Sequence, residues 1–343
     1  MNSTTIDHGP EAGSKDLNAH AEFEALRSSS VIYDLRSRAR VQITGADRVR
    51  WLNGMVTNNV RDLAVNHGVY AFLLNPQGHI QADLYVYNRG DFLLIETDQA
   101  LLEKVIGIFD RYIIMDDVEL ADVTGKLAGI GIAGPKAQNV LGSAGISLSK
   151  IATLELADLK WRGTDLTVAR DDNSAVDSFS LWIEPGQTSS LRQALSESGA
   201  VPVGAEALEL LRIASGIPRY GQDIRERDLP QETEQQRALN FSKGCYIGQE
   251  IVERIRSRGA VHRKFTGFEV EGTLPAPAAK IQVEGKEVGE ITSAATLPFG
   301  EPGRGVALGY IRRELAIQGK ELSTSNARLT VAELPFRGIW LPA

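Results

Sequence analysis

The only cysteine of this 343-residue chain, Cys245, lies in a stretch whose residue types can make its thiol reactive. The stretch begins at Lys243 and reads Lys-Gly-Cys-Tyr-Ile-Gly-Gln-Glu. Ile247, Ile251 and Ile255 repeat every four residues, so a helix is expected to begin directly after the cysteine. A helix N-terminus and a nearby lysine both lower the pKa of a thiol and favour the thiolate. The stretch therefore predicts a reactive thiolate, although a free cysteine is also often a small buried apolar side chain.

The residues around the cysteine support both the loop and the helix. Gly244 and Gly248 permit positive φ angles and the close approach of backbone or ligand. Acidic residues occur in the first turns of the expected helix and arginines near its end, as the helix dipole favours. These residues are Glu250, Glu253, Arg254, Arg256 and Arg258. Gly259 is expected to end the helix.

The helix must be positioned by the rest of the chain, which divides into four parts. Residues 1–28 predict a polar tail followed by a helix from about Leu17 to Ser28. Residues 29–125 and 126–261 each read as an α+β unit, and residues 262–343 as short strands with Gly and Pro between them, typical of a small barrel or sandwich. In the first unit we expect one strand over 33–44 and a helix capped by Asp47.

Two patterns recur along the chain at nearly one spacing. Val-Gln-Ile-Thr-Gly from Val41 recurs as Ile-Gly-Ile-Ala-Gly from Ile130, an offset of 89 residues (130 − 41). Leu-Leu-Ile-Glu ending at Glu96 recurs as Leu-Trp-Ile-Glu ending at Glu184, an offset of 88 (184 − 96). A fixed period indicates a duplication, so we expect two ferredoxin-like units with a ligand groove at their seam. The alternative is that short β-branched strands resemble each other by chance.

Composition limits the function. The chain carries 37 Lys and Arg against 44 Asp and Glu, a net charge of −7, so direct nucleic-acid binding is not expected. One cysteine cannot form an internal disulfide or hold a four-cysteine cluster alone, and it fits a reducing compartment. The five histidines are too scattered to predict a metal site. Without a signal peptide or a bilayer-spanning apolar run, we expect a cytoplasmic protein with no membrane contact.

Residues 223–236 are expected to form an ordered surface loop.

The stretch from Lys243 to Glu250, with Arg254 and Arg258-Gly259 behind it, resembles the signature of the YgfZ family. These are folate-binding proteins of iron–sulfur cluster assembly and repair, also linked to tRNA modification. Other segments resemble the related T-protein (aminomethyltransferase) of the glycine cleavage system. They are Leu211-Arg212, Gly216-Ile-Pro218, Tyr220-Gly221-Gln-Asp223, and the strands from Val288 to Ser293 and from Gly305 to Tyr310. The resemblance implies an α+β fold of two duplicated units and a C-terminal β-barrel, arranged as a three-lobed ring around a central folate channel.

The resemblance also implies roles for individual residues. Cys245 would be a reactive thiolate or transient cluster ligand, completed by a partner protein or glutathione. Lys243 and Arg254 would tune the thiol or contact the anionic tail of tetrahydrofolate or a derivative. Tyr246 would pack near the channel, and the loop would be supported by Gly244, Gly248, Gln249 and Glu250. Folate contacts or catalysis would involve Asp83, Arg212, Tyr220 and Lys243.

Two positions depart from the T-protein pattern. Ala82 stands beside Asp83 where the T-protein has paired aspartates, and Ala214 stands where it has a glutamate of its pterin-binding set. Loss of these carboxylates favours a cluster assembly factor, acting with assembly proteins or client enzymes, over aminomethyl transfer. The alternatives are a folate-dependent one-carbon transfer enzyme that uses Asp83, and a structural module that has lost its ligand. A thiol oxidoreductase is disfavoured because the chain has no second cysteine.

Overall fold

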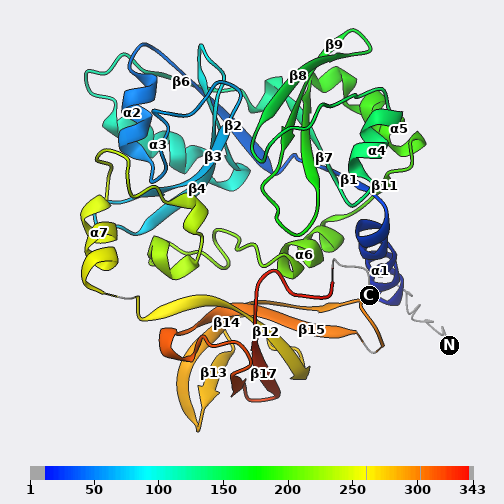
Figure 1. The fold of residues 1–343 in the computed structure, drawn as a ribbon, viewed down its shortest axis with the longest axis vertical. Coiled ribbons are helices and arrows are strands. Elements are labelled where there is room, and N and C mark those ends of the chain that lie inside the picture. Colours follow the sequence, from blue (N-terminus) through cyan, green and yellow to red (C-terminus); the bar gives the residue numbers. More distant parts are fainter. Residues whose placement is uncertain (1–11, 260, 302, 340–343) are drawn as a thin grey trace, which may run out of the picture.

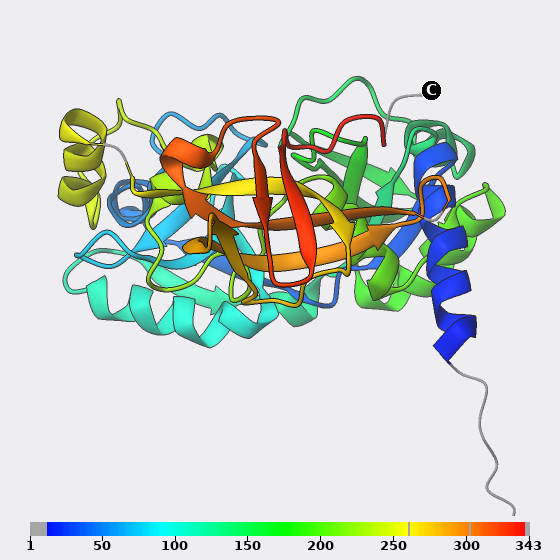
Figure 2. The same cartoon turned by 90° about the horizontal axis from the view of Figure 1, so that it is seen from below.

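The computed structural model describes residues 12–259, 261–301 and 303–339, so most of the expected N-terminal tail lies outside the described residues. Two α/β units stand side by side, and a β-barrel lies beneath the seam between them (Figure 1). In the view from below, the barrel strands cross over this seam (Figure 2). The predicted α+β fold, with duplicated units and a C-terminal barrel in three lobes, is confirmed. Among the described residues, no helix is long and apolar enough to cross a bilayer.

The first unit is an antiparallel sheet that carries helices on one face. It contains β2 (Arg38–Thr44), α2 (Arg48–Met55), β3 (Gly68–Leu74), β4 (Ile80–Asn88), β5 (Leu93–Asp98), α3 (Leu102–Tyr112) and β6 (Glu119–Asp122). The strand order is β3-β4-β5-β2-β6, a ferredoxin-like order with β3 added at the edge. Val105 and Phe109 of α3 pack with Leu52 of α2 against the sheet. Asp47 does precede α2, but its carboxylate accepts from the backbone N–H of Asp117 instead of capping the helix.

The second unit repeats this plan. It contains β7 (Ala128–Ala133), α4 (Ala137–Ser143), β8 (Leu156–Trp161), β9 (Thr164–Arg170), β10 (Ser178–Ile183), α5 (Thr188–Glu197) and β11 (Val201–Pro202). Its strand order is β11-β1-β7-β10-β9-β8. The strand pair β2–β5 of the first unit corresponds to β7–β10 of the second. Val41 lies opposite Ile95 and Ile130 opposite Leu181, so the patterns that recur in the sequence form neighbouring strands in both units.

The prediction of one strand over residues 33–44 is wrong, because the chain forms two strands there, in different sheets. β1 (Val31–Asp34) pairs with β7 in the second sheet, whereas β2 pairs with β5 and β6 in the first. The backbone turns between them, where the N–H of Arg38 donates to the carbonyl of Leu35 at 2.9 Å. β1 thus occupies beside β7 the position that β6 occupies beside β2, and β11 pairs with its other side. Residues 31–34, assigned to the first unit by the sequence, belong by pairing to the second sheet.

The barrel closes in the order β12-β15-β14-β13-β16-β17. Its strands are β12 (Arg263–Gly272), β13 (Lys280–Val283), β14 (Lys286–Leu297), β15 (Arg304–Arg312), β16 (Glu321–Ser323) and β17 (Ala327–Ala332). Two further helices join it to the upper lobes. These are α1 (Ala12–Ser28), which begins earlier than the predicted Leu17, and α6 (Ala205–Ala214). Phe23 of α1 and Ile213 of α6 share an apolar cluster with Phe336 at the barrel.

The acidic segment 223–236 is not the surface loop that its composition predicts. Asp223, Asp228 and Glu232 are buried. Arg263 of the barrel donates to Asp228 at 2.6 Å and to Glu232 at 3.0 Å, which compensates their charges. The segment therefore connects the α/β units to the barrel through buried ion pairs. It leads to α7 (Gln249–Arg258), the helix that was expected after the cysteine.

Candidate functional site: a central cavity and a separate cysteine loop

The helix-free faces of the two sheets meet at the seam around a buried charge network. Glu96 is 6% exposed and accepts from the Nε atoms of Arg38 at 3.2 Å and Arg40 at 3.1 Å. The guanidinium group of Arg40 lies 4.9 Å from the ring centroid of Trp182 in the second sheet. Two guanidinium groups on one carboxylate compensate its buried charge and fix its position.

An inner cavity of about 230 Å³ lies beside this network. Its wall is partly aromatic and partly charged, formed by Tyr33, Tyr85, Tyr87, Arg38, Glu96 and Asp171. Asp171 accepts a hydrogen bond from the Ser180 hydroxyl at 2.8 Å. Burial raises the pKa of Asp171 to about 7, and the charge of Glu96 adds to the rise. At neutral pH this carboxyl group can therefore either accept or donate a hydrogen bond to a bound molecule.

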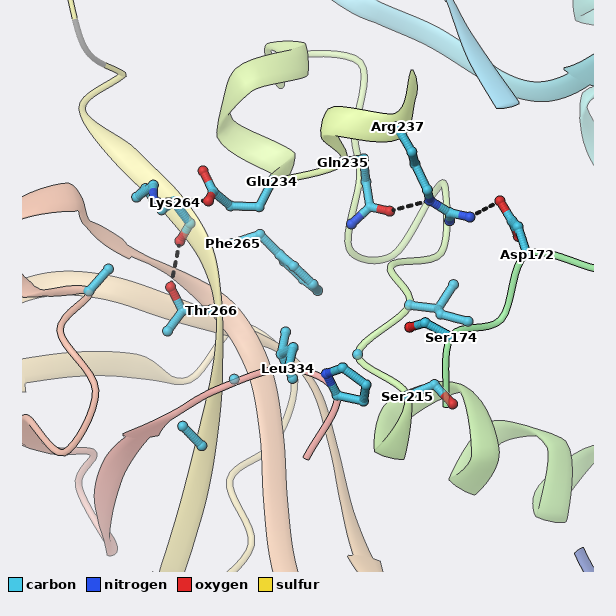
Figure 3. A pocket seen from close by; sticks show the side chains of 16 residues that line it. Asp172, Ser174, Ser215, Glu234, Gln235, Arg237, Lys264, Phe265, Thr266 and Leu334 are labelled. Atoms are coloured by element: carbon cyan, nitrogen blue, oxygen red, sulfur yellow. Dashed lines mark hydrogen bonds and ion pairs between the residues drawn. The ribbon is translucent and has the colours of Figure 1, made fainter. Parts of the chain in front are cut away.

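A larger outer cavity, of about 430 Å³, lies between the second unit, with the segment that follows it, and the barrel (Figure 3). It is lined by the end of α6, the loops at 172–174 and 234–237, and barrel residues that include Phe265. Two ion pairs cross its rim, one between Arg237 and Asp172 and one between Lys264 and Glu234 at 2.9 Å. Asp172 and Ile217 line both cavities, so the inner and outer cavities adjoin.

Cys245 lies apart from these cavities, on an exposed loop before α7. The alternative that it is a buried apolar side chain is therefore wrong. Lys243, two residues earlier, is buried, and its ammonium group donates to three carbonyl groups at the end of α2 and just after it. The acceptors are Asn53 at 2.6 Å, Val56 at 2.6 Å and Asn58 at 2.7 Å. Burial lowers the pKa of Lys243 to about 7, and the charge of Arg61 adds to this, whereas the three carbonyl groups favour the charged form.

The other residues of the motif hold the loop in place. Tyr246 is buried in an apolar cluster with Tyr70 and Phe72 of β3, and burial raises its pKa to about 12. The backbone N–H of Tyr246 donates to the side chain of Gln249 at 3.3 Å. Gly248 has a φ of +80° and caps α7. The thiol is thus exposed on a loop whose flanking residues are fixed.

The remaining motif residues face solvent. Gly244, Glu250 and Arg254 are exposed. The φ of Gly244 is not in the positive range, so the conformational freedom expected of both glycines is used at Gly248 alone. Arg256, in the next turn of α7, lies 4.4 Å from the ring centroid of Phe241. The predicted roles of Glu250 and Arg254 stay predictions.

Asp83 lies on β4, on the same face as the cavity residues Tyr85 and Tyr87, because side chains alternate along a strand. Its carboxylate accepts from the hydroxyl of Tyr70 at 2.9 Å. Burial raises the pKa of Asp83, while the charge of Arg38 and the Tyr70 hydrogen bond lower it. The carboxyl group is therefore near the inner cavity without being part of its described wall.

Arg212 and Tyr220, predicted to contact a cofactor, have partners elsewhere. Arg212 donates to the fully buried Asp223 at 2.6 Å and to Ser293 of β14 at 2.9 Å, which ties α6 to the barrel. The hydroxyl of Tyr220 accepts from Lys104 of α3 at 3.0 Å. Like Lys243, neither is among the described residues that line the two cavities. Their contact with a cofactor stays a prediction.

The sequence reasoning missed the cavity residues Arg38, Glu96, Asp171 and Arg237 as functional candidates. One signal was available for Arg38 and Glu96, because charged residues interrupt otherwise apolar strands and one face of that sheet carries no helix. Asp171 and Arg237 lie in turns between strands or before the cysteine motif, where polar residues are ordinary. Their positions at the inner and the outer cavity depend on contacts between segments far apart in the sequence.

Comparisons with known proteins agree with this architecture. The family model described as the GCVT N-terminal domain matches residues 11–243, and that described as the CAF17 C-terminal beta-barrel domain matches residues 262–336. An aminomethyltransferase of Rubrobacter xylanophilus is 30% identical over 298 residues, which cover 86% of this chain and 79% of that protein. A putative chloroplastic transferase of Arabidopsis thaliana is 25% identical over 333 residues, covering 93% and 74%.

Among solved structures, the glycine cleavage system aminomethyltransferase T from Bartonella henselae is similar with a TM-score of 0.84. The two chains are 20% identical, and the match covers 93% of this chain and 89% of the other, which shows a shared fold. Cys245 and the rest of its motif after Lys243 lie between the two ranges matched by the family models.

Proposed function

The chain belongs to the GCVT N-terminal domain family and carries a CAF17-type barrel, as YgfZ-type proteins related to the T-protein do, and on this premise we propose that it binds a reduced folate and serves iron–sulfur cluster assembly or repair. The observation that supports a role in cluster assembly or repair is the exposed thiol of Cys245, on a loop held in place by Lys243, Tyr246 and Gly248. A single thiolate supplies one ligand, and a partner protein or glutathione would supply the others.

The cavities suit the two ends of a folate. A pterin ring is flat and presents an amide-like edge of donors and acceptors, which a carboxyl group between tyrosines can bind. Asp171 supplies such a group from the second unit, although Ala214 replaces the family's glutamate and is buried toward the barrel. In the outer cavity, Arg237 and Lys264 are the cations for the anionic tail. A bound reduced folate would supply a carrier for one-carbon groups.

The partners follow from the same proposal. Assembly proteins or client iron–sulfur enzymes would meet the protein at the Cys245 loop. An effect on tRNA modification would be indirect, through modifying enzymes that contain a cluster, because a net charge of −7 gives no general attraction for nucleic acid. The cytoplasm is the compartment that such a role and a single free cysteine fit.

The folate part is tested by titrating the purified protein with 5-formyltetrahydrofolate, a chemically stable reduced folate, in a calorimeter. We expect binding by the wild type and at least tenfold weaker binding by Tyr85→Ala, which removes an aromatic wall of the inner cavity. Tyr112→Ala is the matched control, since Tyr112 is exposed at the end of α3. No binding by the wild type, or equal binding by Tyr85→Ala, contradicts the proposal.

A second candidate is folate-dependent one-carbon transfer, with Cys245 incidental. It is favoured by the 30% identity to a protein named aminomethyltransferase and by Asp83, because burial raises the pKa of this carboxyl group and so favours the protonated form that a general acid needs. Production of formaldehyde or methylenetetrahydrofolate from an amine substrate and tetrahydrofolate, lost in Asp83→Asn, would support it. Absence of turnover with folate bound would favour the assembly factor.

A further inference from the structure

The side chains of Arg237 and Asp172 point toward each other in the outer cavity, and Asp172 also lines the inner one (Figure 3). Its guanidinium group pairs with Asp172, donates to Gln235 at 3.1 Å and lies 4.5 Å from the ring centroid of Tyr70. Asp172 lines both cavities and also accepts from the hydroxyl of Tyr85 at 2.9 Å. A molecule that extends from one cavity into the other therefore lies beside this ion pair.

The ion pair can be exchanged for a contact with a ligand. The Arg237 side chain is 33% exposed, so a carboxylate in the outer cavity can reach it. A carboxylate of the ligand can offer Arg237 both of its oxygens, whereas Asp172 accepts from Arg237 with one oxygen and from Tyr85 with the other. Asp172 would keep the hydrogen bond from Tyr85, so the exchange leaves neither group without a partner.

Arg237 is the first residue of a segment, residues 237–243, that ends two residues before Cys245. This segment is hydrogen-bonded to the chain that follows α2. Asn58 contacts both ends of this segment. Its side chain donates to the carbonyl of Arg237 at 2.8 Å, and its own carbonyl accepts from the ammonium group of Lys243 at 2.7 Å. Further hydrogen bonds join Thr57 to Ala238 and Asn240.

We propose that Arg237 binds the anionic group of the cavity ligand in exchange for Asp172, and that segment 237–243 and Asn58 transmit this binding to Cys245. This inference rests on the proposed folate function and adds a regulatory link between its two separate parts. A ligand that holds Arg237 anchors one end of the segment to the cavity, so local opening of the segment and the cysteine loop becomes rarer. Cys245 is then less reactive toward external reagents while the cavity is occupied.

The test measures the rate at which iodoacetamide alkylates Cys245 in the full-length protein, with and without saturating 5-formyltetrahydrofolate. We expect the ligand to slow alkylation at least threefold and to slow amide exchange over residues 237–248. Arg237→Gln should bind the ligand at least fivefold more weakly and, at saturation, show no slowing. Asn58→Ala should bind with wild-type affinity, because Asn58 lies outside the cavities, yet show no slowing either.

Matched controls are Arg256→Gln, which removes an arginine stacked on Phe241, and Asn59→Ala, which removes the neighbouring asparagine. Both should keep the full effect of the ligand. If Asn58→Ala does not fold, the comparison of Arg237→Gln with Arg256→Gln decides. Ligand binding without any change in alkylation or exchange overturns the inference and leaves folate binding intact. No binding by the wild type overturns the proposed function and this inference together.

Discussion

Gly248 and Gly78 lie in direct backbone contact, which joins the start of α7 to the turn between β3 and β4. A Cβ atom on Gly248 would lie 3.1 Å from the Cα of Gly78 and 2.6 Å from the carbonyl oxygen of Asn75. Gly248 also has a φ of +80°, a region that other residues rarely adopt. This contact fixes the loop of Cys245 against the first unit.

Replacing Gly248 by alanine should therefore destabilise the protein. The strained φ and the clash with Asn75 together should lower the free energy of unfolding by about 2 kcal/mol or more. Gly244→Ala is the control, because a Cβ there would meet only the flexible end of Arg61 at 3.4 Å and should change stability by less than about 0.5 kcal/mol. Urea denaturation measures both, and equal midpoints for Gly248→Ala and wild type would refute the role of this contact.

Arg212 should matter for stability and not for ligand contacts. Arg212→Met leaves Asp223 without its guanidinium partner in a site from which water is excluded, so the free energy of unfolding should fall by about 3–5 kcal/mol. The double variant Arg212→Met/Asp223→Leu should recover part of this loss, because it removes both charges. At a temperature where Arg212→Met stays folded, its affinity for 5-formyltetrahydrofolate should equal that of the wild type. A selective loss of affinity would instead support the predicted cofactor contact.

Asp171 predicts a specific pH dependence of stability. Its pKa in the folded protein is about 7, above the ordinary 3.8, so the folded state binds its proton more tightly than the unfolded chain does. This stabilisation is fully present below pH 4 and is lost as the pH rises through 7. Asparagine does not titrate. Between pH 5 and 8 the free energy of unfolding of Asp171→Asn should therefore rise relative to that of the wild type by on the order of 1–2 kcal/mol, allowing for partial solvent access. Parallel stability curves for the two proteins would rule this out.

The parts of the fold that local patterns specify could be predicted from the sequence. The barrel strands β12 to β17 lie within residues 262–343, where short strands were predicted, and α7 begins after the cysteine as expected. The position of β1 could not be predicted, because no Gly or Pro marks the turn at 35–37. Its partner β7 is about a hundred residues away in the chain, so only tertiary pairing decides the sheet to which it belongs.

The candidate site was predicted in part, for the same reason. The motif around Cys245 is contiguous, so its loop, helix and glycines could be identified from their spacing. The direction of the Lys243 side chain could not be predicted, because the carbonyl groups that accept from it are near residue 55, far away in the sequence. The two cavities likewise combine residues from different lobes, Glu96 and Asp171 in the inner one and Arg237 and Phe265 in the outer one. Acidic residues such as Asp228 are predicted to be exposed because the sequence does not show that Arg263 pairs with them.

The central claim is that the exposed thiol of Cys245 acts in iron–sulfur cluster assembly or repair. It is tested most directly in cells that lack their own YgfZ-type protein, by the activity of a cluster-dependent enzyme at equal expression of each variant. Wild type and Ser242→Ala, a change in the same exposed part of the loop, should restore the activity. Cys245→Ser should fold normally and leave the activity at the level of the deficient cells. Equal restoration by Cys245→Ser and wild type would contradict the account.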